Sequence, residues 1–127
     1  MINQEQENIL SELRNFSGTE GYHKFSILSD MVLTDGIKFL CDKLECYWLM
    51  DIVSSVQHKK KIIENFSFIV WKIKVNKDKS FTVQAYRDSP FNSKNLLYSQ
   101  SAGYTDFKLN DFEFYQCGKV ILLTGEY

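Results

Sequence analysis

The spacing of apolar side chains changes near residue 60, and this change constrains the fold more than any other feature. Before residue 57, apolar side chains recur every three or four positions, as in Ile37, Leu40, Cys41 and Leu44. From residue 66 onward the spacing becomes two, with Trp71 and Ile73 alternating with lysines. A period of 3.6 indicates an amphipathic helix and a period of two a half-buried strand. Helices followed by strands predict an α+β fold.

Three helical segments are expected in the first half of the chain. The first contains Ile9 to Phe16 and ends at residues 17–19, where glycine and hydroxyl residues favour a turn. A second begins at Thr34-Asp35-Gly36, because a Thr or Asp side chain can accept hydrogen bonds from the first helical N–H groups. The apolar pattern that continues to Val56 is read as two helices or as one helix bent near Cys46.

The second half predicts an antiparallel sheet of four or five strands, with the helices packed on one face. One hairpin turns at residues 76–79, a third strand covers 96–104, and a second hairpin turns at Gly118. Residues 22–33 are ambiguous, with an irregular strand possible over 23–28. The chain is expected to form a single domain over 1–127. The predicted core includes Leu13, Leu40, Leu44, Ile52, Trp71, Ile73 and Leu122.

Charge is segregated along the chain although the net charge is only −1. Residues 57–94 hold nine Lys and Arg against three Asp and Glu, and the remainder holds six against thirteen. Alternation places two of the lysines opposite Trp71, facing solvent. A lysine surface could neutralise phosphates, so a nucleic-acid-binding module is one alternative function. The lysines concerned are Lys59, Lys60, Lys61, Lys72, Lys74, Lys77 and Lys79.

The three cysteines, Cys41, Cys46 and Cys117, match no metal-binding spacing. The polar N-terminus does not read as a signal peptide, and the apolar runs are too short to span a membrane. We therefore predict a cytoplasmic protein with free thiols, in which Cys41 and Cys117 are buried and Cys46 is partly accessible. No metal site and no cofactor are predicted.

No catalytic motif is apparent. Glycine-rich phosphate loops and a G-x-S-x-G nucleophile elbow are both lacking. A cluster of His23, Asp35, Asp51 and Asp106 could perform acid–base chemistry, which gives a second alternative, an enzyme with an unfamiliar site. Helix capping explains Asp35, a turn explains Asp106, and an ordinary loop or strand position explains His23, so the structural interpretation is favoured.

Several strings, in order along nearly the whole chain, resemble a family of small uncharacterised proteins of bacteria, phages and other mobile elements. Where the family pattern has a proline after Thr-Asp-Phe, this chain has Lys108. The resemblance implies no activity and no catalytic residue. The strings are Phe16-Ser17-Gly18-Thr19-Glu20, Thr34-Asp35-Gly36, Tyr47-Trp48-Leu49-Met50-Asp51, Tyr104-Thr105-Asp106-Phe107 and Gly125-Glu126-Tyr127.

These observations favour a small non-enzymatic binding protein that acts on another macromolecule, a protein or ribonucleoprotein complex. Direct contact with nucleic acid is the alternative and a membrane partner is not expected. The resemblance implies the further hypothesis of a mobile-element counter-defence inhibitor, of the kind that blocks CRISPR effectors. Beside the lysines, the aromatic side chains of Tyr47, Trp48 and Tyr104 are candidate contacts. The oligomeric state is left open.

Overall fold

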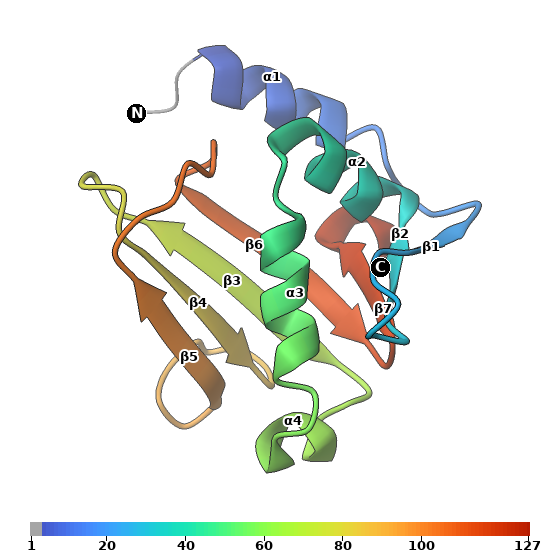
Figure 1. The fold of residues 1–127 in the computed structure, drawn as a ribbon, viewed down its shortest axis with the longest axis vertical. Coiled ribbons are helices and arrows are strands. Elements are labelled where there is room, and N and C mark those ends of the chain that lie inside the picture. The colour runs from blue at the N-terminus through green and yellow to red at the C-terminus, as the bar shows by residue number, and fades with distance from the viewer. Residues whose placement is uncertain (1–3) are drawn as a thin grey trace.

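The computed structural model describes residues 4–127, and its centre is one seven-stranded sheet (Figure 1). Neighbouring strands follow the order β1-β2-β7-β6-β3-β4-β5, and every pair is antiparallel except β2 with β7. The strands are β1 Tyr22–Lys24, β2 Val32–Thr34, β3 Ile69–Val75, β4 Phe81–Tyr86, β5 Leu96–Ala102, β6 Asp111–Cys117 and β7 Val120–Leu123.

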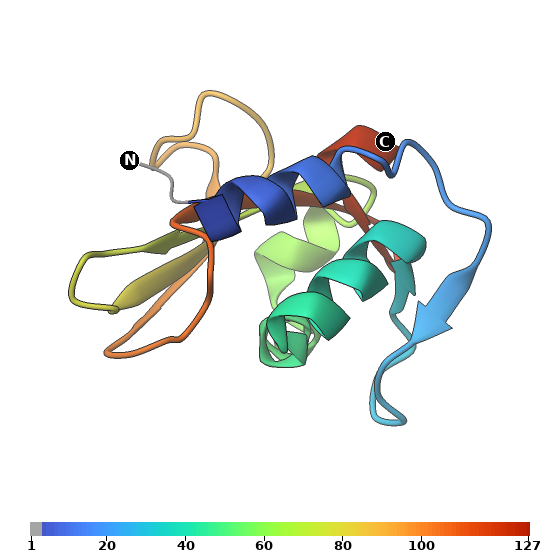
Figure 2. The ribbon, with the colours of Figure 1, turned by 90° about the horizontal axis from the view of Figure 1, so that it is seen from above.

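The helices lie on one face of this sheet, which Figure 1 shows from the helical side and Figure 2 from above. Helix α3 crosses the middle of the sheet, and α2 lies against β2 and β7. A 3₁₀ turn, η1, follows β7. The bounds are α1 Gln4–Leu13, α2 Asp35–Leu44, α3 Tyr47–Ser55, α4 Lys60–Glu64 and η1 Thr124–Glu126. The α+β class is therefore confirmed.

The sheet has more strands than the four or five predicted. Both hairpins and the strand near residue 96 are present, and the excess consists of β1 and β2. These two strands have only three residues each, too few to show a period of two. Strand β2 joins the sheet through a parallel pairing with β7, almost ninety positions later, which no local pattern can indicate.

Two local signals behave as the sequence predicts. Thr34 caps α2, since its hydroxyl oxygen accepts a hydrogen bond from the Ile37 N–H at 3.4 Å. Gly118 has a φ of +62°, a left-handed conformation that glycine adopts without strain, and it reverses the chain between β6 and β7. Between α2 and α3, Glu45 takes a left-handed conformation and ends α2, so the region forms two helices.

The core lies between the helices and the covered face of the sheet. Six of the seven predicted core residues are buried, and Trp71 and Ile73 are almost completely enclosed. Ile52 is the exception, because it is only partly buried. The inward face of α3 is formed by Leu49, Met50 and Val53, so Met50 takes the place that was expected for Ile52.

The thiols differ from the prediction at two positions. All three are free, and Cys41 is buried as expected. Cys46 is also fully buried, because it lies at the junction of α2 and α3, where its Sγ approaches the Leu40 carbonyl oxygen at 3.8 Å. Cys117 is only partly buried at the end of β6. A hydrogen bond with Cys46 and burial raise the pKa of Cys41, and burial raises that of Cys117.

The other face of the sheet carries polar cross-strand pairs and is partly covered by the loop over 87–95. Thr82 and Ser101 hydrogen bond at 3.0 Å across β4 and β5. The Phe91 ring of the loop lies 5.2 Å from the Tyr86 ring and 4.2 Å from the Lys72 Nζ. Among residues 4–127, no helix has the length and apolar character needed to cross a membrane.

Candidate functional site

Three of the strings that carry the family resemblance meet at the N-terminus of α2. The Glu126 carboxylate accepts hydrogen bonds from the Thr34 hydroxyl at 2.6 Å and the Gly36 N–H at 3.1 Å. Gly125 lies so close to the Phe16 carbonyl oxygen that an added Cβ would stand 3.3 Å from it. Residues 16–20, 34–36 and 125–127 are thus bound to one another, and this part of the pattern is explained by the fold.

His23 and Asp35 form the one close pair among the four residues considered for acid–base chemistry. The His23 Nε2 lies 2.7 Å from the Asp35 Oδ1, and the Glu20 N–H donates to the Asp35 Oδ2 at 3.0 Å. The hydrogen bond from His23, followed by that from Glu20, lowers the pKa of Asp35. The pair is about one third exposed and ties β1 to the start of α2.

Asp51 and Asp106 lie apart from that pair. Asp51 is exposed on α3, and Asp106 lies in the segment after β5, beside Trp48. Neither hydrogen bonds to His23 or Asp35. Within residues 4–127, no three His, Cys, Asp or Glu side chains are placed to share a metal ion. The geometry therefore gives a two-residue contact with a structural role and not a four-residue constellation.

The seven candidate lysines do not gather on one surface. Lys60 and Lys61 are on α4, whereas Lys77 and Lys79 are in the β3–β4 turn, and Figure 1 shows these at opposite ends of β3. Lys59 lies 5.8 Å from the centre of the Tyr98 ring.

The two strand lysines are on the uncovered face, as alternation predicts, but they differ in exposure. Lys74 is exposed, whereas Lys72 is partly buried. The Lys72 Nζ is 4.0 Å from the Glu113 carboxylate and also packs on Phe91. The lysines therefore offer separate local charges and not one track for a phosphate backbone.

The aromatic candidates are split between two places. Trp48 packs edge-on against Phe81 at 5.3 Å and lines a shallow hollow with Tyr104 and Asp106. Tyr104 is 70% exposed there. Tyr47 instead donates a hydrogen bond to the Asp42 carboxylate of α2. Burial and this carboxylate raise the pKa of Tyr47.

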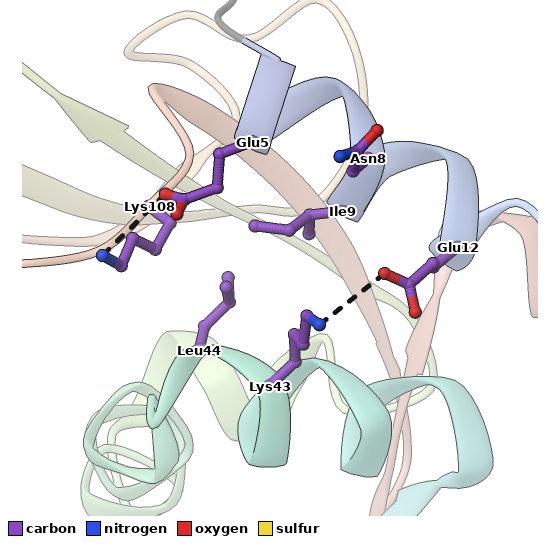
Figure 3. Close-up of a pocket in the computed structure, with 7 residues that line it drawn as sticks. All are labelled: Glu5, Asn8, Ile9, Glu12, Lys43, Leu44 and Lys108. Atoms are coloured by element: carbon purple, nitrogen blue, oxygen red, sulfur yellow. Dashed lines mark ion pairs between the residues drawn. The ribbon is translucent and has the colours of Figure 1, made fainter.

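A cleft of about 460 Å³ separates α1 from α2 (Figure 3). Ile9 and Leu44 face each other across it, and an ion pair closes each end. Glu5 pairs with Lys108 at 3.8 Å, and Glu12 with Lys43 at 3.8 Å. The four charged side chains at the ends of the cleft thus face one another in two pairs.

The largest anomaly on the surface is a turn between β1 and β2 that sequence reasoning did not single out. Ile27 and Leu28 are 100% and 93% exposed at its corner. The Ser29 N–H donates to the Ser26 carbonyl at 3.4 Å, and the Leu28 N–H to the Ser26 hydroxyl oxygen at 3.1 Å. We call residues 26–29 the aliphatic turn. Figure 2 shows the light blue β1 and the loop after it reaching beyond the body of the domain.

The composition of the aliphatic turn has no structural explanation. Corner positions of turns usually hold Gly, Pro, Asn, Asp or Ser, which suit the backbone or bind water. Phe25 and Met31 on either side point into the protein and pack against its core, whereas Ile27 and Leu28 do not. The sequence did contain a signal for this site: Ile27 and Leu28 are flanked by two serines in a segment whose secondary structure was ambiguous.

The fold and surface define a small α+β domain with an exposed aliphatic turn and no assembled catalytic constellation among the described residues. The chain belongs to DUF6876, a family of unknown function, whose sequence model matches residues 7–127. Neither a curated protein nor a solved structure matched the chain.

Proposed function

We propose that this chain is a non-enzymatic binding protein that acts on a protein or ribonucleoprotein complex, and that Ile27 and Leu28 anchor the contact. The observation that supports the proposal is the nearly complete exposure of these two aliphatic side chains at the corner of a hydrogen-bonded turn. At this corner the two aliphatic side chains gain no burial within the chain itself. Burial in an apolar pocket of a partner would explain them as binding anchors.

The expected strength of this contact follows from the apolar area. Full burial of one aliphatic side chain contributes about 1.5–3 kcal/mol. The Ser26 and Ser29 hydroxyl oxygens accept hydrogen bonds from Leu28 and Met31 and hold the turn in place, so little further ordering is needed on binding. A few anchor residues usually carry most of the binding energy of an interface, and the contacts around them mainly exclude water.

Within this class we propose a counter-defence inhibitor carried by a mobile element and active in the cytoplasm of its host. The expectation that this family occurs in phages and other mobile elements motivates this proposal by analogy alone. The expected result is that the protein protects a plasmid from interference by the host's CRISPR effector. If plasmid loss is equal with and without the protein for every effector type of the host, the inhibitor function is contradicted. The proposed general binding function is unaffected by that result.

Replacing both anchors by serine should weaken partner binding at least tenfold. The tagged protein and the Ile27→Ser/Leu28→Ser variant are each used to capture partners from the native host, with nuclease treatment, and the captured proteins are quantified. The parent should enrich a protein that survives nuclease treatment, and the variant should lose it. Folding should be unchanged, because exposed substitutions usually alter stability by less than about 0.5 kcal/mol.

Ile63→Ser is the matched control, since Ile63 is another exposed aliphatic side chain, on α4. It should retain the partner. Equal capture by the parent and the double variant would show that the aliphatic turn is not the anchor. Capture that disappears with nuclease and depends steeply on salt would favour the nucleic-acid alternative and its lysines instead.

A further inference from the structure

The two outer edges of the sheet are built differently. At one edge, β1 has only three residues and carries Lys24. At the other edge, β5 has seven residues, with no charged residue and no proline. Soluble proteins usually protect an edge strand by making it short or by placing charges, proline or a bulge on it. The irregularity in the β4–β5 register is confined to the start of β5, at Leu96–Tyr98, so the rest of the strand to Ala102 keeps a regular edge that is left open to pairing.

On the outer side of β5, the backbone N–H and C=O groups face no neighbouring strand of the sheet. Its inner side pairs with β4 from Tyr98 to Ala102 without interruption, and the one irregularity is near Leu96. In an antiparallel pair, alternate residues direct their N–H and C=O groups to opposite sides. Figure 1 shows β5 as the outermost strand of the sheet.

The side chains of β5 also leave room for another strand. Ser99 and Ser101 are exposed on the uncovered face, and they hydrogen bond inward to Gln84 and Thr82 of β4. These side chains are small and uncharged. A strand that pairs with the edge would meet hydroxyl groups and not the ends of long charged side chains.

The distribution of charge around β5 indicates which partner strand fits its edge best. Residues 95–105 carry no formal charge, Lys94 precedes them and Asp106 follows them. If two copies of β5 pair antiparallel about a two-fold axis, the Lys94 end of one strand lies near the Asp106 end of the other. The uncharged middle then meets itself without like charges opposite each other, which would be destabilising. The Lys59 ammonium group also lies beside β5, where it packs over the Tyr98 ring of the same chain.

We propose that two copies of this chain associate through antiparallel pairing of their β5 edges, which joins the two sheets into one. A two-fold axis near Ser99 makes the interface self-complementary, as closed dimers require. This association uses the edge opposite to β1 and the aliphatic turn, so it does not depend on the proposed partner function.

Sedimentation velocity over a concentration series tests this proposal with charge variants at the axis. The parent should show a monomer–dimer equilibrium. Ser99→Lys should raise the dimer dissociation constant at least tenfold, because symmetry places two new cations side by side. An equal mixture of Ser99→Lys and Ser99→Glu should restore the dimer as a heterodimer. Ser67→Lys, which makes the same change at an exposed position outside the strands, should leave it intact.

Circular dichroism verifies that each variant is folded, and Ser99→Arg with Ser99→Asp replaces the first pair if either variant is not. A parent that remains monomeric at every concentration would overturn the proposal, even if a different protein's strand were found to pair with β5. A dimer that survives a folded Ser99→Lys or Ser99→Arg variant would also overturn it, since the contact would then lie elsewhere.

Discussion

Gln116→Met should lower the free energy of unfolding by about 4 kcal/mol. The Gln116 side chain is completely buried on β6, where its Oε1 accepts a hydrogen bond from the Trp71 Nε1 at 3.0 Å. Its Nε2 donates to the Gly118 carbonyl oxygen at 3.0 Å and to the Gln57 Oε1 at 2.7 Å. Methionine has a similar volume but cannot replace these bonds, and each buried group left without a partner costs about 1–3 kcal/mol.

Urea denaturation of the parent and variants measures this effect. Gln57→Met is the matched control, since Gln57 is only partly buried and its loss leaves the Trp71 and Gly118 bonds in place. We expect it to cost about 1 kcal/mol. A loss below about 1 kcal/mol for Gln116→Met would mean that the amide network does not connect the helices to the sheet centre.

Glu126→Ala should cost about 3 kcal/mol, the second largest effect expected. The Glu126 carboxylate binds the Thr34 hydroxyl and Gly36 N–H at the start of α2, and it also accepts from the Leu123 N–H at 2.9 Å. Hydrogen bonds to charged groups contribute about 1.5–3 kcal/mol each, and partial exposure of Glu126 lets water recover part of this. The carboxylate also lies at the positive end of the helix dipole.

A double-mutant cycle with Gly36→Ala isolates this contact. An alanine Cβ at position 36 would stand 2.6 Å from the Glu126 Oε1 and 2.4 Å from the Leu123 Cδ1. Gly36→Ala should therefore destabilise the parent by about 1–3 kcal/mol through overpacking. It should cost less in the Glu126→Ala background, where one of the two clashes is gone. Strictly additive losses would contradict the packing of η1 against α2.

Elements with strong local signals were predictable. The β3–β4 hairpin follows from the alternation around Trp71, and the start of α2 follows from the capping side chain of Thr34. The predictions that failed depend on contacts between distant parts of the chain or on the exact orientation of a helix. Strand β2 depends on its pairing with β7, and Ile52 is only partly buried because the inward face of α3 is formed by Leu49, Met50 and Val53.

The candidate site was less predictable than the fold, because surfaces are assembled in three dimensions. Lys60 and Lys77 belong to one basic stretch of sequence, but β3 separates them. His23 and Asp35 meet because β1 pairs with the strand that leads into α2. Ile27 looked like part of an irregular strand, and only its complete exposure distinguishes it from a core residue.

Site-specific photo-crosslinking in the native host tests whether the aliphatic turn contacts a partner protein. A photoreactive phenylalanine analogue is placed at Leu28, at Tyr104 or at Lys77, all exposed positions on different parts of the surface. We expect one strong protein adduct from position 28 that resists nuclease, with weaker or no adducts from the other two. A nucleic-acid adduct from position 77 without a protein adduct from position 28 would contradict this expectation.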